Sequence, residues 1–176
     1  GIKSVEKREV FIRTVLRAGF FAYLAGDLDG IERNCLFNEE TGEFVKVDWD
    51  ASGGVVTGKA FTVSLQMVPG SKKTTLMAVG EVLRSVPLEL MMHHHLTLKD
   101  DPEMQEYFQT SYKNAQTPKG KQALLSIFRI MYQEYGEAMA EKQLNEYLER
   151  LADIVEHGYP KKLGRDGYMH DLEQDI

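Results

Sequence analysis

Cysteine and long apolar runs are the two features that this sequence most clearly lacks. Cys35 is the single cysteine among 176 residues, which excludes an intramolecular disulfide framework and any zinc or redox site built on paired cysteines. The most apolar early run, residues 18–26, is far shorter than the roughly 20 apolar residues that span a bilayer. We therefore expect a protein of a reducing compartment, most simply the cytoplasm, that makes no contact with a membrane.

Charge of one sign does not dominate the chain either. It has 21 lysines and arginines against 27 aspartates and glutamates, a formal net charge of -6, which excludes a generally basic nucleic-acid-binding surface. The cations are concentrated at the start, where residues 1–24 hold five basic and two acidic residues. With 43% hydrophobic and 27% charged residues, the composition is that of an ordinary acidic, folded domain.

Recognised catalytic motifs are missing as well. Residues 53–60 space two glycines and a lysine as a phosphate-binding loop does, but Ala60 stands where that loop needs serine or threonine. Residues 27–30 resemble the start of a calcium loop, yet Ile31 and Asn38 occupy two of its ligand positions. We therefore predict turns at both places, and no cofactor.

Residues 3–24 form the first predicted helix. Apolar side chains such as Phe11, Leu16 and Phe20 recur on one side at helical spacing. Gly26 then ends the helix, because it tolerates the left-handed conformation. The opposite side carries four cations, Lys3, Lys7, Arg13 and Arg17. They are candidates for contacting an acidic partner or the phosphates of a nucleic acid, although a solvated helix surface is the simpler explanation.

Strand patterns follow the first helix. Turn-forming residues 39–42 separate residues 31–38 from residues 43–49, which is typical of a hairpin. Residues 61–67 alternate apolar and polar side chains with a period of two. The economical interpretation is three antiparallel strands, with Cys35 as a small apolar residue packed in the first of them.

The middle of the chain is harder to assign. Apolar residues at helical spacing predict a helix over residues 72–84, and Lys72 and Lys73 at its positive end are a candidate anion site. We expect Pro87 to end or kink this helix. Residues 88–98 alternate leucine or methionine with other residues, so a fourth strand is favoured over a continued helix.

Three consecutive histidines are the only local concentration of metal-binding residue types in the sequence. On a strand, His93 and His95 project from the same face as Glu89, an arrangement that suits Zn²⁺ or Fe²⁺. On a helix, Glu89 and His93 are neighbours instead. A polar surface that binds no metal is the simpler explanation in both cases.

The C-terminal half is predicted to be helical. Asp100 or Asp101 can cap a helix that begins at Pro102. Thr117 can likewise cap a helix that begins at Pro118. The apolar pattern then continues to a glycine stop signal after residue 157, which predicts either one kinked helix or two helices stacked end to end.

The chain is predicted to form a single domain over residues 1–160, followed by a mobile acidic tail over residues 161–176. Large aromatic residues are frequent in the helical half, and one small sheet cannot bury them all. We therefore predict an interface with another protein or with a second copy of the chain, a homo- or hetero-oligomer, that uses Tyr107, Phe108, Tyr112, Tyr132 and Tyr135.

Together these patterns predict an α+β fold, with a small antiparallel sheet of three to four strands flanked by an N-terminal helix and a mainly helical C-terminal half. The favoured function is a non-enzymatic protein-protein interaction module, an adaptor, regulator or assembly component. The alternatives are a nucleic-acid-associated protein that uses the basic first helix, and a metal-dependent hydrolase or oxygenase that uses His93 and His95.

Overall fold

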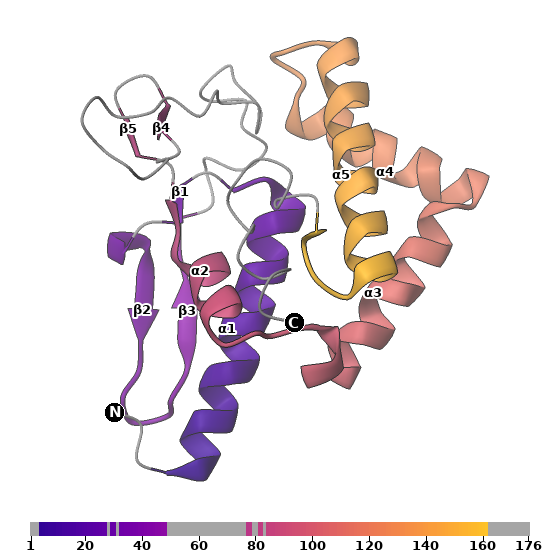
Figure 1. The fold of residues 1–176 in the computed structure, drawn as a ribbon. Helices are drawn as coiled ribbons and strands as arrows, with labels where there is room; N and C mark the ends of the chain where they lie inside the picture. Colours follow the sequence, from indigo (N-terminus) through magenta and orange to yellow (C-terminus); the bar gives the residue numbers. More distant parts are fainter. Residues whose placement is uncertain are drawn as a thin grey trace.

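The computed structural model describes residues 4–27, 29–30, 32–48, 77–78, 81–82 and 84–161. Helices dominate this part of the chain (Figure 1). Its five α-helices are α1 (Val5–Ala25), α2 (Val86–His93), α3 (Pro102–Ala115), α4 (Pro118–Met131) and α5 (Glu137–His157). Its short strands are β1 (Asp29–Gly30), β2 (Cys35–Phe37), β3 (Phe44–Lys46), β4 (Met77–Ala78), β5 (Glu81–Val82) and β6 (Arg84–Ser85). The broad α+β class is confirmed.

Within the described residues, the strands form three separate pairs rather than one sheet. β2 and β3 are antiparallel, with Leu36 opposite Val45, so the predicted hairpin is confirmed. β4 and β5 form a second antiparallel pair, and β1 lies parallel to β6. The predicted count of three to four strands in one sheet is not confirmed.

Several predictions fall outside the described residues: the turn over residues 53–60, the strand over residues 61–67, the cations Lys3, Lys72 and Lys73, and the tail from residue 162 onward.

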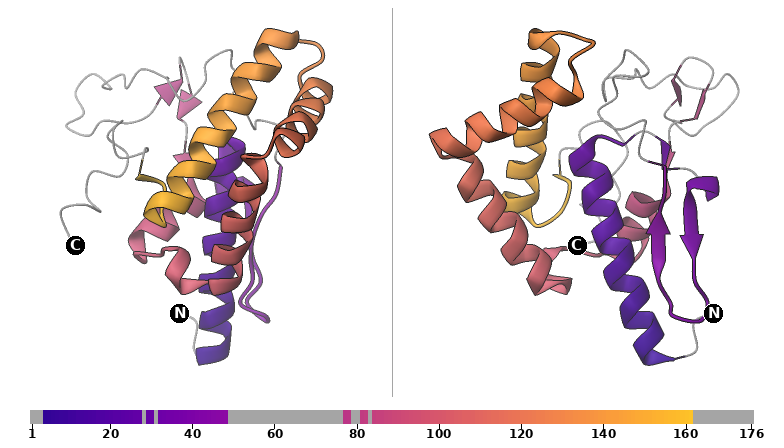
Figure 2. Two further views of the ribbon diagram at one scale, coloured as in Figure 1. Left: turned by 90° about the vertical axis from the view of Figure 1, so that its right-hand side faces the viewer. Right: turned by 180° about the vertical axis from the view of Figure 1, so that it is seen from behind.

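α1 lies between the β2–β3 hairpin and helices α3 and α5 (Figure 2). The helix begins because the Ser4 hydroxyl accepts the Lys7 N–H at 3.1 Å, and it ends because Gly26 adopts a left-handed conformation at φ 64°. The end agrees with the predicted stop at Gly26, whereas the helix begins two residues later than predicted. α2 packs closely on α1 at Gly19, where a Cβ atom would overlap the side chain of Met91.

The hairpin is held on α1 partly by backbone contacts. The Thr14 hydroxyl accepts the Phe44 N–H at 2.9 Å, which ties β3 to the middle of the helix. Gly42, with φ at 84°, lies directly against the backbone of Lys7. The side chains of Phe44 and Lys46 point inward and are buried. The hairpin therefore covers one side of α1.

A buried ion pair joins the turn after α1 to this hairpin. The Lys46 ammonium lies 3.3 Å from the Asp27 carboxylate, and neither side chain is exposed. Lys46 also donates to the carbonyl oxygen of Val47 at 2.7 Å. Asp27 therefore has a structural cation beside it. The turn predicted over residues 27–30 is wrong for Asp29–Gly30, which forms strand β1 and pairs with β6.

α2 contradicts the favoured prediction for residues 88–98. Val86–His93 is a helix, so the helical alternative is right for this part. Pro87 lies in the first turn, where its missing N–H leaves no bond unmade, and it begins a helix instead of ending one. Leu88 and Met91, three residues apart, are both buried, which is the helical spacing that the alternation concealed.

The predicted helix over residues 72–84 is also wrong where the structure describes it. Met77–Ala78 and Glu81–Val82 are paired strands. Helical spacing over one or two turns is a weak signal, because tertiary context readily overrides it.

α3 and α4 begin, and α5 ends, at the predicted signals. Asp101 caps α3 by accepting the Met104 N–H, and Thr117 caps α4 by accepting the Gly120 N–H at 3.0 Å. Gly158 ends α5 in a left-handed conformation. The prediction of one kinked or two stacked helices is wrong, because the chain turns after α4 and α5 packs beside it (Figure 1).

Two clusters of buried side chains form the core. The larger joins α1, α2, α3 and α5 and includes Val15, Phe20, Met91, Phe108 and Leu151. The smaller lies between α4 and α5 and consists of Phe128, Tyr132, Ala140 and Leu144, with partly buried neighbours. α4 is therefore covered mainly on the side that faces α5.

Candidate interaction surface

The structure separates the five aromatic residues of the predicted interface. Phe108 is fully buried and Tyr132 is 7% exposed, so both are core residues and the predicted interface is corrected to leave them out. Tyr112 is partly buried. Tyr107 and Tyr135 are each 52% exposed, but they lie on α3 and after α4, respectively. The exposed aromatic residues thus do not form the continuous surface that the sequence suggested.

A different apolar surface lies on α4. Ala123, Ile127, Ile130 and Met131 are all exposed, and their spacing of i, i+4, i+7 and i+8 places them on one side of the helix. The exposed fractions are 51% for Ile127, 71% for Ile130 and 59% for Met131. We call these four residues the α4 face. Contiguous exposed apolar side chains are one of the features by which interaction surfaces are recognised.

The α4 face exists because the apolar part of α4 is wider than α5 can cover. Leu124 and Phe128, four residues apart, pack toward α5, whereas the α4 face lies to one side of them. The remaining side of the helix is polar, with Gln122, Ser126 and Arg129 exposed. α4 thus has one apolar strip covered by the core and a second, adjacent strip left in water.

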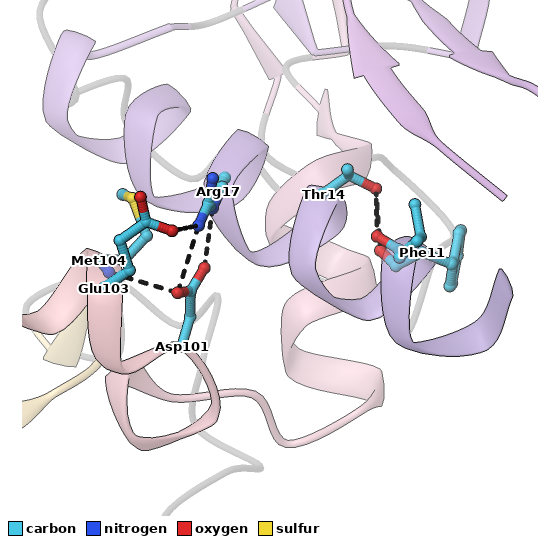
Figure 3. Close-up of polar contacts among 7 residues, drawn as sticks. Phe11, Thr14, Arg17, Asp101, Glu103 and Met104 are labelled. Atoms are coloured by element: carbon cyan, nitrogen blue, oxygen red, sulfur yellow. Dashed lines mark hydrogen bonds and ion pairs between the residues drawn. The ribbon is translucent and has the colours of Figure 1, made fainter. Parts of the chain in front are cut away.

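The cations of α1 are largely engaged within the protein. Arg17 Nε donates to Asp101 at 2.8 Å, and Arg17 Nη2 donates to Glu103 at 2.7 Å (Figure 3). These hydrogen bonds, with Asp101 first and Glu103 second, raise the pKa of Arg17 above its ordinary value. Lys7 Nζ donates to the Glu39 carbonyl oxygen at 3.1 Å. Of the described members of the predicted basic arc, Arg13 forms no such hydrogen bond, but its charge helps to lower the pKa of Asp101.

Asp101 is the buried partner in this pair. Burial by itself would raise its pKa, but the hydrogen bonds from Arg17 and from the Met104 N–H outweigh burial and hold the pKa below the ordinary value. Arg17 is therefore a structural cation that is partly neutralised by two carboxylates, and a phosphate would have to compete with both of them.

The histidine cluster does not adopt the chelating geometry expected of a strand. His93 ends α2, His95 lies beyond it with φ at 51°, and both are exposed. His94 lies between Phe11 and His93, and partial burial, followed by the neighbouring positive charges, lowers its pKa. Among the described residues, no three histidine, cysteine, aspartate or glutamate side chains converge as a metal site.

A buried polar network at the contact of α1 and α5 was missed by the sequence reasoning. The Tyr23 hydroxyl donates to Asp153 Oδ2 at 2.7 Å, and His157 Nδ1 lies 3.0 Å from Asp153 Oδ1. Burial, and then the hydrogen bond to Asp153, raise the pKa of Tyr23. The spacing of four between Asp153 and His157 is a visible signal of their contact, whereas Tyr23 is 130 residues from Asp153. The network fixes α5 on α1.

An open, mostly apolar groove of about 590 Å³ follows α1 on the side between β3 and helices α3 and α5. Its walls include Phe21, Val45, Tyr107 and Tyr147. Tyr107, from the predicted interface, therefore belongs to this groove and not to the α4 face.

Comparison of the chain with protein-family models, with curated proteins and with solved structures found no match. None of the described helices combines the length and the hydropathy that a membrane crossing requires.

Proposed function

We propose that this protein is a protein-protein interaction module, an adaptor, regulator or assembly component, that contacts its partner through the α4 face. The supporting observation is the set of three large aliphatic side chains, Ile127, Ile130 and Met131, each more than half exposed. Removing apolar surface from water contributes about 25 cal/mol per Å², so a complementary partner gains binding free energy wherever it covers these side chains.

The composition around the α4 face supports the proposal. Interface centres are depleted in charged residues and enriched in large apolar ones, and the α4 face contains no charged residue. Polar side chains such as Ser126 and Gln122 lie at its border and behind it. This arrangement of an apolar centre beside a polar rim is common to protein interfaces. The cytoplasm is the proposed compartment, because a chain with a single cysteine suits a reducing environment.

Site-directed photo-cross-linking in the cells that make the protein tests this proposal. A photoreactive amino acid at Ile130 should give a discrete protein adduct, because this side chain would be covered by the partner. The matched control is the same amino acid at Gln122, which is exposed on the polar side of α4 and should give little adduct. Equal labelling from the two positions, or none from Ile130, would contradict the proposal.

The variant Ile130→Glu separates a binding role from a structural one. Because Ile130 is 71% exposed, the substitution should change the free energy of unfolding by no more than about 0.5 kcal/mol. It should nevertheless abolish the adduct formed from a photoreactive group at position 127. Loss of stability by several kcal/mol would instead show that the α4 face supports the fold.

A further inference from the structure

The α4 face has a gradient of side-chain size along the helix. Its N-terminal end is small, with Ala123 following Gly120, and its C-terminal end is large, with Ile130 and Met131. Ile127 lies near the middle. At about 1.5 Å per residue, Ala123 and Ile130 are separated by about 10 Å along the axis. Two such surfaces placed side by side in opposite directions set large side chains against small ones.

Charge also changes along α4, from positive at its N-terminal end to negative beyond its C-terminal end. Lys119 and Lys121 are exposed in the first turn of α4, at the positive end of the helix dipole. Glu134 is exposed just beyond the last turn, near the negative end. An antiparallel pair of α4 helices therefore places Lys119 of each copy opposite Glu134 of the other, whereas a parallel pair aligns like charges.

We infer that the partner of the α4 face is a second copy of this chain, packed antiparallel about a two-fold axis at Ile127. This inference rests on the proposed function and names its partner. With Ile127 opposite its own counterpart, a residue four positions after it faces a residue four positions before it, so Met131 of one copy meets Ala123 of the other, and Lys119 comes within one residue of Glu134 along the helix axis. The size gradient and the charge gradient thus select the same register, and a two-fold axis requires such self-complementarity.

The expected dimer is weak. Two helices of 14 residues that pack along one strip bury less surface than the roughly 1,600 Å² of a standard interface. We therefore expect a concentration-dependent equilibrium with a dissociation constant on the order of micromolar. Sedimentation equilibrium of the full chain should show monomer and dimer interconverting, and Ile130→Glu should remove the dimer.

Cysteine cross-linking tests the orientation. In a Cys35→Ser background, chains with Ala123→Cys are mixed with differently tagged chains that carry Met131→Cys, and a short bis-maleimide is added. The mixture should give a heterodimer severalfold more efficiently than either chain alone gives a homodimer. Homodimers of the Ala123→Cys chain alone would indicate parallel packing and overturn the inference. Gln122→Cys, on the polar side of α4, is the background control.

Charge reversal tests the register. Lys119→Glu or Glu134→Lys alone should weaken the dimer by about threefold to tenfold, because each interface then loses two opposite-charge pairs. The two substitutions in one chain should restore the wild-type value within about twofold. Lys119→Glu is expected to leave the helix intact, since an acidic residue is favourable in the first turn. Failure of the double variant to recover would overturn this register.

The cross-linking and sedimentation results together separate the two proposals. A chain that stays monomeric, while a photoreactive group at Ile130 captures a different protein, would overturn the second copy as partner and leave the interaction module standing. A monomeric chain with no specific adduct from Ile130 would overturn both.

Discussion

Arg17 and Asp101 form a two-point ion pair that fastens the middle of α1 to the start of α3. Arg17 Nε and Nη2 donate to the two carboxylate oxygens at 2.8 Å and 3.3 Å. The same carboxylate accepts the Met104 N–H and so caps α3 (Figure 3). One side chain, 4% exposed, therefore both begins a helix and positions it against its neighbour.

Asp101→Ala should lower the free energy of unfolding by about 1 to 3 kcal/mol, because the helix cap and the ion pair are lost together. The matched control is Glu103→Gln, which removes the other carboxylate that Arg17 contacts. Glu103 is 81% exposed, so its loss should cost less than about 1 kcal/mol. Urea unfolding followed by circular dichroism measures both. Equal losses would contradict the role assigned to Asp101.

The Arg17–Asp101 pair also predicts how stability depends on pH. The pKa of Asp101 is lower in the folded protein than its ordinary value, so the unfolded chain binds protons more readily than the folded one. The contribution of Asp101 is therefore present above a pH of about 3.9 and is lost as the pH falls through its folded pKa. The stability difference between wild type and Asp101→Asn should shrink in that acid range. A difference that stays constant would argue against the pair.

Tyr23→Phe tests the buried network between α1 and α5. The substitution keeps the ring but leaves the buried Asp153 carboxylate without the Tyr23 hydroxyl, so we expect a loss of about 1 to 3 kcal/mol in unfolding free energy. Tyr135→Phe is the control, because Tyr135 is half-exposed. That variant should change stability by less than about 0.5 kcal/mol. Similar effects from the two would indicate that the network contributes little.

Helix boundaries were predictable from sequence because their chemistry is local. Asp101, Thr117 and Gly158 end or begin helices as expected, since capping depends on a side chain or a φ angle within a few residues. The strand predicted over residues 88–98 is wrong because Met91 places an apolar residue on the other side of the alternation, and this short stretch therefore fits a helix as well as a strand. Pro87 indicates the start of this helix, since proline is favoured in the first turn of a helix as well as after its last turn.

The candidate surface was less predictable than the fold. The sequence shows that apolar residues of α4 occupy a wide arc, but which part of that arc α5 covers depends on how the chain turns after Met131. Phe128 is 9% exposed and Ile130 is 71% exposed, and their spacing of two places them on opposite sides of the helix, but nothing local shows which of those sides α5 covers. Composition alone cannot assign one residue to the core and another to water, so the predicted aromatic interface includes core members such as Phe108.

Gly42→Ala tests the close contact between the hairpin and α1. Gly42 has φ at 84°, and a Cβ atom there would overlap the backbone of Lys7, which cannot rotate away. The matched control is Gly158→Ala, because Gly158 has φ at 79° but nothing within 4 Å of the added atom. Backbone strain alone should cost about 1 kcal/mol in the control, and the overlap should add a further loss of about 1 to 3 kcal/mol at Gly42. Thermal unfolding of the two variants measures the difference, and equal losses would show that the hairpin can shift away from α1 at no cost.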